Sequence, residues 1–265
     1  MERDVKILAN QFREDGYLSP VSIYSDQEIS KTKSSFLEFE NNLDKVREDY
    51  ENLHFHSTWA RDLATHPKLL DLIETIIGPE ILIYGSLILN KIPGNNSHLS
   101  WHQDQYFFPE KKSTPYISAW IALTHSTANN GCMKMLPFSH KEGILPHLPF
   151  SKDDTNLLTK GEEIKISPTN DQIFDNILSP GQLSLHDGAL VHSSSPNLTD
   201  QNRIGFIVRF VTPDISITNN PLLQVRGNKT ISHLPIYKKP SFSSVDKAIK
   251  SYQNKNIKNS TLEKS

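Results

Sequence analysis

The feature that most constrains the fold is a series of short apolar runs between residues 80 and 213. The runs are rich in β-branched and aromatic residues and are separated by Gly, Pro and Asn, a pattern typical of strands divided by turns. They read ILIYGSLILN, YISAWIALT, CMKML, GQLSLHD and RIGFIVRFV. The sequence therefore predicts a β core over about residues 80–215.

Helical periodicity precedes this core. Residues 25–28, SDQE, form a capping box, in which the Ser and Glu side chains bind each other's backbone N–H groups at a helix start. The apolar spacing that follows predicts a helix of about five turns, and a second helix should run from near Thr65-His66-Pro67 to Gly78-Pro79. The apolar stripe of the first helix comprises Ile29, Phe36, Phe39, Leu43 and Val46. That of the second helix comprises Leu69, Leu70, Ile73, Ile76 and Ile77. We interpret about residues 1–79 as a helical layer that covers a sheet.

The chain length suits one domain over residues 1–240, since double-layered β folds commonly occupy this length as a single unit. The polar segment 151–176 is long for a loop in a compact domain, and we interpret it as a candidate lid. Residues 241–265 are polar and should form a short helix, around 244–252, and a tail. The expected fold class is mainly β with flanking helices (α+β).

Composition narrows the range of partners. The 28 basic and 30 acidic residues are interspersed and give a net charge of −2. This distribution provides no electrostatic footprint for nucleic acid or for an anionic membrane, so a small-molecule substrate is expected. The N-terminus lacks an apolar signal core and no window reaches membrane-spanning length, so we expect a cytoplasmic location. Cys132 is the single cysteine, so any metal must be bound by His, Asp or Glu.

The stretch SWHQDQYFFP, residues 100–109, places His102 and Asp104 two residues apart. In a strand they would face the same side and bind one ion, while Gln103 would point away. A 2-His-1-carboxylate facial triad needs one further histidine and leaves positions open for a cosubstrate and oxygen. His186 and His192 are alternatives for that third ligand.

A second His-x-acid match, His140-Lys141-Glu142, competes with this motif. It follows Pro137-Phe138-Ser139 in a turn-rich stretch, which favours a solvated loop. His102 instead lies among aromatic residues, which suits a site shielded from water.

A dicarboxylate cosubstrate would need a guanidinium group at its far end. Arg203 and Arg209 both lie in the last strong strand and are about 20 Å apart along it, so only one of them can bind that carboxylate. The turn-forming segment SSSPNLTDQN lies between His192 and Arg203. It could return the chain antiparallel and bring Arg203 beside His192.

Three segments, in this order and spacing, resemble the phytanoyl-CoA dioxygenase family of Fe(II)/2-oxoglutarate-dependent oxygenases. They are WHQDQYFFP, SAWIALTHSTANNGCMKMLPFSHKEG and GQLSLHDGALVHSSSPNLTDQNRIGFIVRF, within a resemblance that covers about residues 10–215. The resemblance implies a double-stranded β-helix (jelly-roll, cupin-like) core, packed by the N-terminal helices. It implies iron ligands at His102, Asp104 and His192, and a 2-oxoglutarate pocket formed by Arg203, Ser194, Trp120, Gln103 and Leu87. His186 would then be an interior polar residue or a neighbour of the ligands.

The same resemblance implies a 2-oxoglutarate-dependent non-haem iron dioxygenase that uses Fe(II), 2-oxoglutarate and O2. The cosubstrate would be decarboxylated to succinate and CO2 while an unactivated C–H bond is hydroxylated, desaturated or cyclised. Related halogenases carry a small residue at the position of Asp104, so the carboxylate favours oxygen insertion over halogenation.

The substrate is less constrained. A natural-product intermediate or amino-acid-like metabolite is our preferred hypothesis, and an acyl-CoA or carrier-bound acyl group is the alternative. Lys111 and Lys112 lie close to the metal motif and would suit a CoA group, but a solvated loop explains them at least as well. Candidate substrate-pocket residues are His54, His56, Tyr106, Phe107 and Arg209. Two rival hypotheses are a non-catalytic jelly-roll binding protein and a cupin-like metal-dependent isomerase or hydrolase, which would give Arg203 no role.

Overall fold

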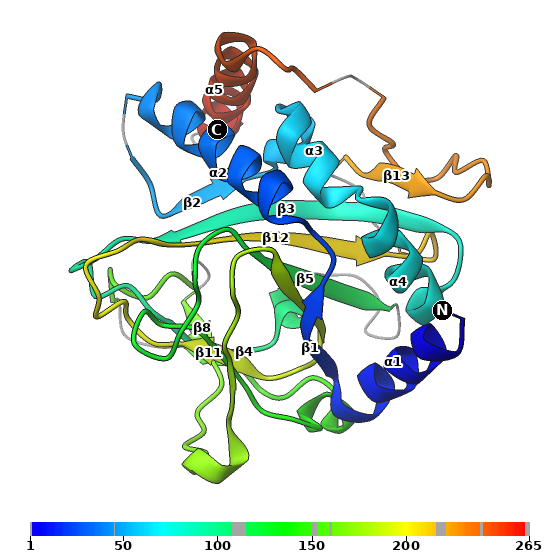
Figure 1. The fold of residues 1–265 in the computed structure, drawn as a ribbon, viewed down its shortest axis with the longest axis vertical. Coiled ribbons are helices and arrows are strands. Elements are labelled where there is room, and N and C mark those ends of the chain that lie inside the picture. The colour runs from blue at the N-terminus through cyan, green and yellow to red at the C-terminus, as the bar shows by residue number, and fades with distance from the viewer. Residues whose placement is uncertain are drawn as a thin grey trace.

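Two antiparallel β-sheets face each other, and helices cover the outer face of the larger one (Figure 1). The computed structural model describes residues 2–44, 46–107, 115–149, 153–158, 161–215, 221–238 and 241–262. Lys111 and Lys112 lie outside the described residues.

The larger sheet has the strand order β1-β10-β5-β12-β3-β13, and β2 pairs with the same edge of β3 as β13. Its central strands are buried on both faces, which explains why their sequences are almost continuously apolar instead of alternating. The strands are β1 (Tyr17–Ser22), β2 (Asp49–Glu51), β3 (Ile81–Lys91), β5 (Tyr116–Ala122), β10 (Gln182–Asp187), β12 (Arg203–Val211) and β13 (Leu223–Arg226).

The smaller sheet has the order β4-β11-β6-β9. Its strands are β4 (Leu99–His102), β6 (Met133–Met135), β9 (Phe174–Asn176) and β11 (His192–Ser194). Apolar side chains of both sheets, including Trp120, Met135 and Ile207, pack in one cluster between them. A separate two-stranded ribbon consists of β7 (Leu148–Pro149) and β8 (Glu162–Glu163).

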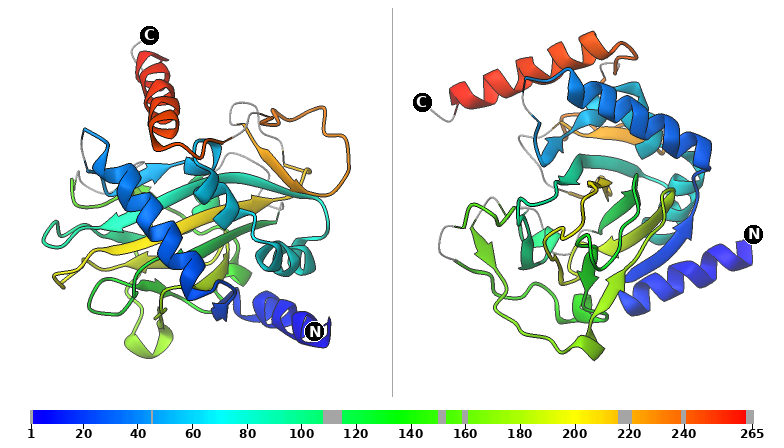
Figure 2. Two further views of the ribbon diagram at one scale, coloured as in Figure 1. Left: turned by 45° about the horizontal axis from the view of Figure 1, so that its top comes forward. Right: turned by 60° about the vertical axis from the view of Figure 1, so that its left-hand side comes forward.

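The helices form the third layer. Figures 1 and 2 show α2 (Asp26–Asn41), α3 (Thr58–Ala64) and α5 (Val245–Leu262) on the side of the larger sheet away from the smaller one. The helices α1 (Glu2–Asp15) and α4 (Pro67–Ile77) lie at one end of the sheet. The largest core cluster fills this layer and joins Phe36 and Phe39 of α2 to Phe206 and Phe210 of β12. Short 3-10 helices are η1 (Leu53–Phe55), η2 (Asp104–Phe107), η3 (Ser139–Glu142) and η4 (Asn170–Gln172).

Both predicted N-terminal helices are present, but the first is shorter than expected. The capping box at Ser25 is complete: Ser25 N donates to Glu28 Oε2 at 2.8 Å, and Glu28 N donates to Ser25 Oγ at 3.3 Å. The helix ends at Asn41, where the side chain of Asn42 donates to the carbonyl of Glu38 at 2.8 Å. The prediction that Leu43 and Val46 continue the helix was therefore wrong. The second helix spans Pro67–Ile77 and ends at Gly78, which has a φ of 90°, as predicted.

Other segments also differ from expectation. The N-terminal layer contains β1 and β2, which belong to the larger sheet. They were not recognised because their sequences, YLSPVS and DYE, contain a proline or acidic residues and form no apolar run. The C-terminal helix begins near the predicted point and is longer than predicted. The described part of segment 151–176 includes β9, which pairs with β6 in the smaller sheet. Movement of this segment as a lid stays a prediction.

Candidate active site

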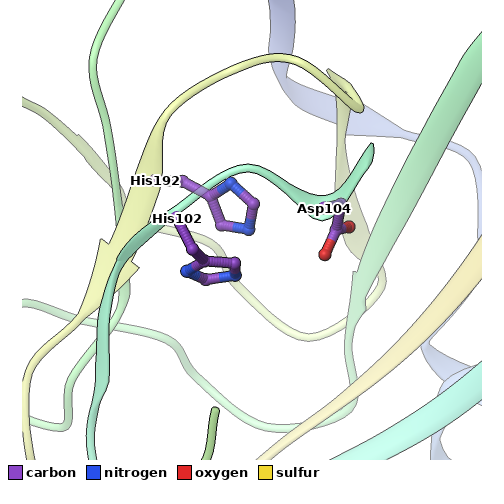
Figure 3. A group of neighbouring side chains, drawn as sticks. All are labelled: His102, Asp104 and His192. Atoms are coloured by element: carbon purple, nitrogen blue, oxygen red, sulfur yellow. The ribbon is translucent and has the colours of Figure 1, made fainter. Parts of the chain in front are cut away.

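His102, Asp104 and His192 lie together between the two sheets (Figure 3). Each is buried and offers one ligand atom, and these three atoms lie within 4.8 Å of one another. His102 ends β4 and pairs directly with His192 of β11, so that their ring centroids are 4.1 Å apart. Asp104 begins η2, so it meets His102 because the strand ends there, and not through the strand alternation expected from the sequence.

Both imidazoles are oriented by the backbone. His102 Nδ1 lies 2.7 Å from the carbonyl oxygen of Ser100, and His192 Nδ1 lies 2.9 Å from that of Leu190. A carbonyl oxygen only accepts, so both Nδ1 atoms must carry the proton and donate. Each Nε2 therefore keeps a lone pair for a metal, the arrangement typical of metal-binding histidines.

The electrostatics keep these ligands ready for a cation. Burial lowers the pKa of His102, while the nearby Asp104 carboxylate partly opposes this effect. Burial, together with the neighbouring imidazoles of His102 and His186, lowers the pKa of His192 well below its ordinary value. Both rings are thus neutral at pH 7 and no proton competes with a metal for Nε2.

Asp104 is surrounded by donors from three strands of the larger sheet. Ser118 Oγ donates to Asp104 Oδ2 at 2.6 Å, and His186 Nε2 lies 3.5 Å from the same oxygen. Arg209 Nη2 lies 3.6 Å from Oδ1. Burial alone would raise the pKa of Asp104, but the Arg209 guanidinium and the contact with His186 outweigh it and hold the pKa well below its ordinary range.

A cavity of about 60 Å³ contains this group and extends towards Arg203. Its lining residues are Leu87, Leu89, Leu99, His102, Asp104, Trp120, Met133, His186, His192, Ser193, Ser194, Arg203, Ile207 and Arg209. Arg203 and His192 share this cavity although β12 and β11 lie in opposite sheets. The expected antiparallel return of the chain is instead a crossing from the smaller sheet to the larger one.

Arg203 is buried in the cavity wall without its full set of partners. The residue is 1% exposed, and its guanidinium lies 5.2 Å from the ring centroid of Trp120. Within the described residues, Nε and Nη2 have no hydrogen-bond partner. Burial lowers the pKa of Arg203 to about 10, so the group remains charged at neutral pH. A buried cation with unused donors is costly unless an anion binds beside it.

Three of the four remaining residues predicted for the 2-oxoglutarate pocket line the same cavity: Trp120, Ser194 and Leu87. Gln103 is not among the lining residues. Its Nε2 donates to the carbonyls of Gly143 at 2.8 Å and Ala189 at 2.5 Å, and its Oε1 accepts from Leu145 N at 2.8 Å. Its side chain thus binds backbone groups of the surrounding loops.

The residues predicted for the substrate pocket are divided between two regions. Arg209 lines the cavity, and Phe107 has its ring centroid 6.1 Å from that of His102. Tyr106 stacks on His147 at 3.7 Å. His54 and His56 are not among the cavity-lining residues.

The two histidines of the substrate prediction are held elsewhere in the fold. His54 Nδ1 lies 2.7 Å from Ser86 Oγ, and His56 Nδ1 lies 2.8 Å from Ser251 Oγ. Because Ser86 precedes the cavity-lining Leu87 on β3, its side chain faces the opposite side of the sheet. The structure therefore places His54 towards the helical layer.

Some neighbours of the site carried no signal in the sequence. Ser118 lies in an apolar run, and Lys91 lies at the end of another. Lys91 is completely buried, pairs with Arg203 across β3 and β12, and donates from Nζ to the carbonyls of Ser194 at 3.2 Å and Ser195 at 2.5 Å. A charged residue at the end of an apolar strand was the available hint.

The competing motif is part of the surface. His140, Lys141 and Glu142 lie on η3, where Lys141 Nζ lies 2.6 Å from Glu14 Oε1 and His140 Nε2 lies 3.0 Å from the carbonyl oxygen of Arg13. These contacts attach η3 to α1. Among the described residues, the only group found that could hold a metal is His102, Asp104 and His192, and it contains no residue of this motif. This agrees with the prediction that the motif is not the metal site.

A family model for phytanoyl-CoA dioxygenase (PhyH) matches residues 12–205. The chain belongs to the PhyH family. Among its relatives, human peroxisomal phytanoyl-CoA dioxygenase is 25% identical over 219 residues, which are 80% of this chain and 63% of the human protein. The bovine enzyme is 26% identical over 202 residues, or 74% of this chain and 58% of that protein. The chain thus spans about three fifths of the length of these two PhyH relatives.

Solved structures show the same PhyH-type fold. The apo form of ThoJ, a non-haem monooxygenase, is 27% identical, with a TM-score of 0.78 over 97% of this chain and 100% of ThoJ. CytC3 with Fe(II) and α-ketoglutarate is 18% identical, with a TM-score of 0.66 over 87% of this chain and 92% of CytC3. At that identity the CytC3 likeness concerns the fold alone.

These comparisons confirm the family and the jelly-roll fold class predicted from the sequence. They also confirm, for the PhyH family and its solved relatives, the predicted class of non-haem iron oxygenase and the predicted iron and 2-oxoglutarate. Among the described residues, none of the helices combines the length and the apolar character needed to span a bilayer.

Proposed function

We propose that this PhyH-family protein is an Fe(II)- and 2-oxoglutarate-dependent dioxygenase that oxidises an unactivated C–H bond of a small molecule. One observation carries the proposal: the buried His102, Asp104 and His192 group shares a cavity with the incompletely paired guanidinium of Arg203. The first provides a metal site and the second provides an anion site, and a 2-oxoglutarate-dependent dioxygenase needs both.

The donor set fits iron(II). Two neutral imidazoles and one carboxylate form the facial set typical of non-haem iron oxygenases. Each imidazole has its Nδ1 bound to a backbone carbonyl, so both can present Nε2 to the metal. The metal would offset the cost of burying the Asp104 carboxylate.

The far end of the cavity fits the distal carboxylate of 2-oxoglutarate. Among the described residues, Arg203 has two nitrogens without a hydrogen-bond partner, and the buried Oγ of Ser194 has none either. Both line the cavity, and Trp120 forms an apolar wall beside them. We assign Arg203 and Ser194 to carboxylate binding and Trp120 and Leu87 to the walls around the carbon chain.

When bound, iron with 2-oxoglutarate and O2 supplies the oxidising chemistry, in which 2-oxoglutarate becomes succinate and CO2. The protein holds the three ligand side chains, orients the cosubstrate through Arg203 and excludes water with Leu87, Leu89 and Ile207. Because Asp104 fills the carboxylate position, we infer oxygen insertion, desaturation or ring closure in preference to halogenation.

We infer a small metabolite or natural-product intermediate as the substrate. The interspersed basic and acidic residues and the net charge of −2 support this inference, because they favour a small molecule over a large anionic partner. An acyl-CoA or carrier-bound substrate is the second candidate, supported by the relatedness to human and bovine phytanoyl-CoA dioxygenase. Phe107 and Arg209 are the substrate-contact candidates with positions beside the His102, Asp104 and His192 group.

The experiment is a measurement of succinate formed from 2-oxoglutarate by the aerobic, Fe(II)-loaded protein. The proposal expects Fe(II)-dependent succinate formation, which Asp104→Ala abolishes and Arg226→Met, on the distant strand β13, leaves unchanged. Metal binding without any succinate would favour the isomerase or hydrolase hypothesis. No metal binding at all would favour a non-catalytic jelly-roll protein.

A further inference from the structure

The surroundings of Asp104 form a feature of their own. Ser118 of β5 pairs in register with His186 of β10 on one side and with Arg209 of β12 on the other. Directly paired residues of antiparallel strands project their side chains on the same face of a sheet. The three side chains therefore form one polar row across the middle of the larger sheet, directed towards Asp104.

The row has the shape of a receptor for a carboxylate. Ser118 is the short central member, with a longer side chain on each side, and its hydroxyl binds Asp104 Oδ2 at 2.6 Å. His186 approaches the same oxygen at 3.5 Å, and Arg209 approaches Oδ1 at 3.6 Å. A hydroxyl, an imidazole and a guanidinium thus contact the two oxygens of one carboxylate from three strands.

The placement of His186 points to the same role. Its side chain is 2% exposed, and neither ring nitrogen has a hydrogen-bond partner within the described residues. Burying an imidazole without hydrogen bonds costs free energy of folding, unless a neighbouring charged or polar group interacts with it. Its Nε2 lies 3.5 Å from Oδ2 of the Asp104 carboxylate, and its ring centroid lies 4.7 Å from that of His192.

We propose that Ser118, His186 and Arg209 form a carboxylate cradle that fixes Asp104 before the metal binds. This inference rests on the proposed function, in that it takes Asp104 as a metal ligand. The three are positioning residues: they set the orientation of the carboxylate, so that the bound metal meets a ligand that does not need to reorganise.

The cradle also explains why a free carboxylate should substitute for the Asp104 side chain. Asp104→Gly would leave the hydroxyl, imidazole and guanidinium in place around an empty volume. Formate, which carries the same charged group, should occupy that volume and complete the metal site. A merely structural role for the three residues gives no reason for such a rescue.

The test is an absorption titration with Co(II), which reports metal binding independently of turnover. Ser118→Ala, His186→Phe and Arg209→Met should each weaken Co(II) binding by about 10–100-fold, as expected for neighbours of metal ligands. The matched controls are Ser126→Ala, at another buried serine, and Arg226→Met, at a surface arginine. Both should bind Co(II) like the wild type. Circular dichroism checks that each variant is folded. If His186→Phe or Arg209→Met unfolds the protein, the smaller Ser118→Ala substitution still tests the proposal.

Formate gives the decisive comparison. It should restore Co(II) affinity to Asp104→Gly by about tenfold or more, and it should fail with Asp104→Gly combined with Arg209→Met. Unaltered Co(II) affinity in the three single variants, or rescue that does not depend on Arg209, would overturn the cradle. Cradle-dependent Co(II) binding without succinate formation would overturn the proposed function alone. Absence of Co(II) binding by the wild type would overturn both.

Discussion

At the scale of single residues, the chemistry of the site depends on which polar atoms already make hydrogen bonds within the protein. His102 and His192 donate from Nδ1 to the backbone and so can present Nε2. Arg203, at the other end of the cavity, keeps two nitrogens without partners in the part of the chain that the structure describes. Gln103 lies between two ligands in sequence, yet backbone groups occupy its amide. Residue type and spacing identify candidate site residues. The hydrogen bonds that each side chain already makes show which of its polar atoms can bind a metal or a cosubstrate.

Arg203 should determine the affinity for the distal carboxylate of the cosubstrate. Arg203→Met should weaken binding of 2-oxoglutarate on the order of a hundredfold, because removing one partner of a buried charge pair costs about 2–5 kcal/mol. Binding of 2-oxovalerate, which lacks that carboxylate, should change little. The measurement is competition calorimetry or absorption of the oxygen-free Fe(II) protein. Equal losses for both acids would show that Arg203 acts only through the fold, and Arg226→Met serves as the control.

The site residues that the sequence could suggest were those that belong to short motifs or to the segments of the family resemblance. His102 and Asp104 lie in one motif, and the family resemblance selected His192 over His186 and Arg203 over Arg209. Ser118 and Lys91 could not be predicted, because their partners lie on strands that are remote in sequence. The sequence also did not show that Asp104 lies just after the end of β4, and not on the same strand face as His102.

At the scale of secondary-structure elements, strands β3, β5 and β12 position the cosubstrate end of the cavity. Gly205 of β12 lies directly against Trp120 of β5: an added Cβ would come within 2.1 Å of the indole Cζ2. Lys91 of β3 binds the carbonyls at the end of β11 and so ties the larger sheet to the smaller one. Two small details of packing thus fix the space around Arg203.

Gly205→Ala should displace the Trp120 ring. We expect a loss of about 1–3 kcal/mol in the free energy of unfolding, the usual cost of adding a methyl group to a filled core. Urea denaturation measures this loss, and 2-oxoglutarate affinity should fall as well. The matched control is Gly85→Ala on β3, where the nearest atom, Asn52 Oδ1, is 3.1 Å from the added Cβ. A Gly205→Ala protein as stable as the wild type would contradict this packing.

Lys91 should make stability depend on pH. Burial and the nearby Arg203 lower the pKa of Lys91 to about 6, whereas an unfolded lysine has a pKa of about 10.4. Between these values the unfolded chain binds a proton that the folded chain lacks, so the free energy of unfolding rises with pH. Lys91→Met should reduce this rise. Urea denaturation from about pH 6.5 to 9 tests it, with exposed Lys229→Met as the control. Identical pH dependence in wild type and Lys91→Met would contradict the buried position.

Element prediction succeeded where a pattern was long. The five apolar runs correspond to β3, β5, β6, β10 and β12, and the capping box and the Pro and Gly signals located two helices. The strands β1 and β2 were missed because their sequences, YLSPVS and DYE, form no apolar run, and they are strands through their pairing with β10 and β3. The end of α2 was misplaced because the apolar stripe continues beyond the point where Asn42 ends the helix.

At the scale of the whole molecule, three layers enclose a buried polar region between the two sheets. The helices and the outer face of the larger sheet form the main core, and the inner faces of the two sheets hold the ligand group, the Asp104 cradle and Arg203. A fold that buries these charges must compensate them with ligands of opposite charge. The central claim is therefore that one cavity binds iron(II) at His102, Asp104 and His192 and 2-oxoglutarate at Arg203.

The most direct test is an oxygen-free absorption titration of the metal-free protein with Fe(II) and then with 2-oxoglutarate. We expect a visible metal-to-ligand charge-transfer band that appears only when both are present. The band should be lost in Asp104→Ala, and in Arg203→Met it should require a much higher concentration of 2-oxoglutarate. A wild-type protein that stays colourless with saturating Fe(II) and 2-oxoglutarate would contradict the account.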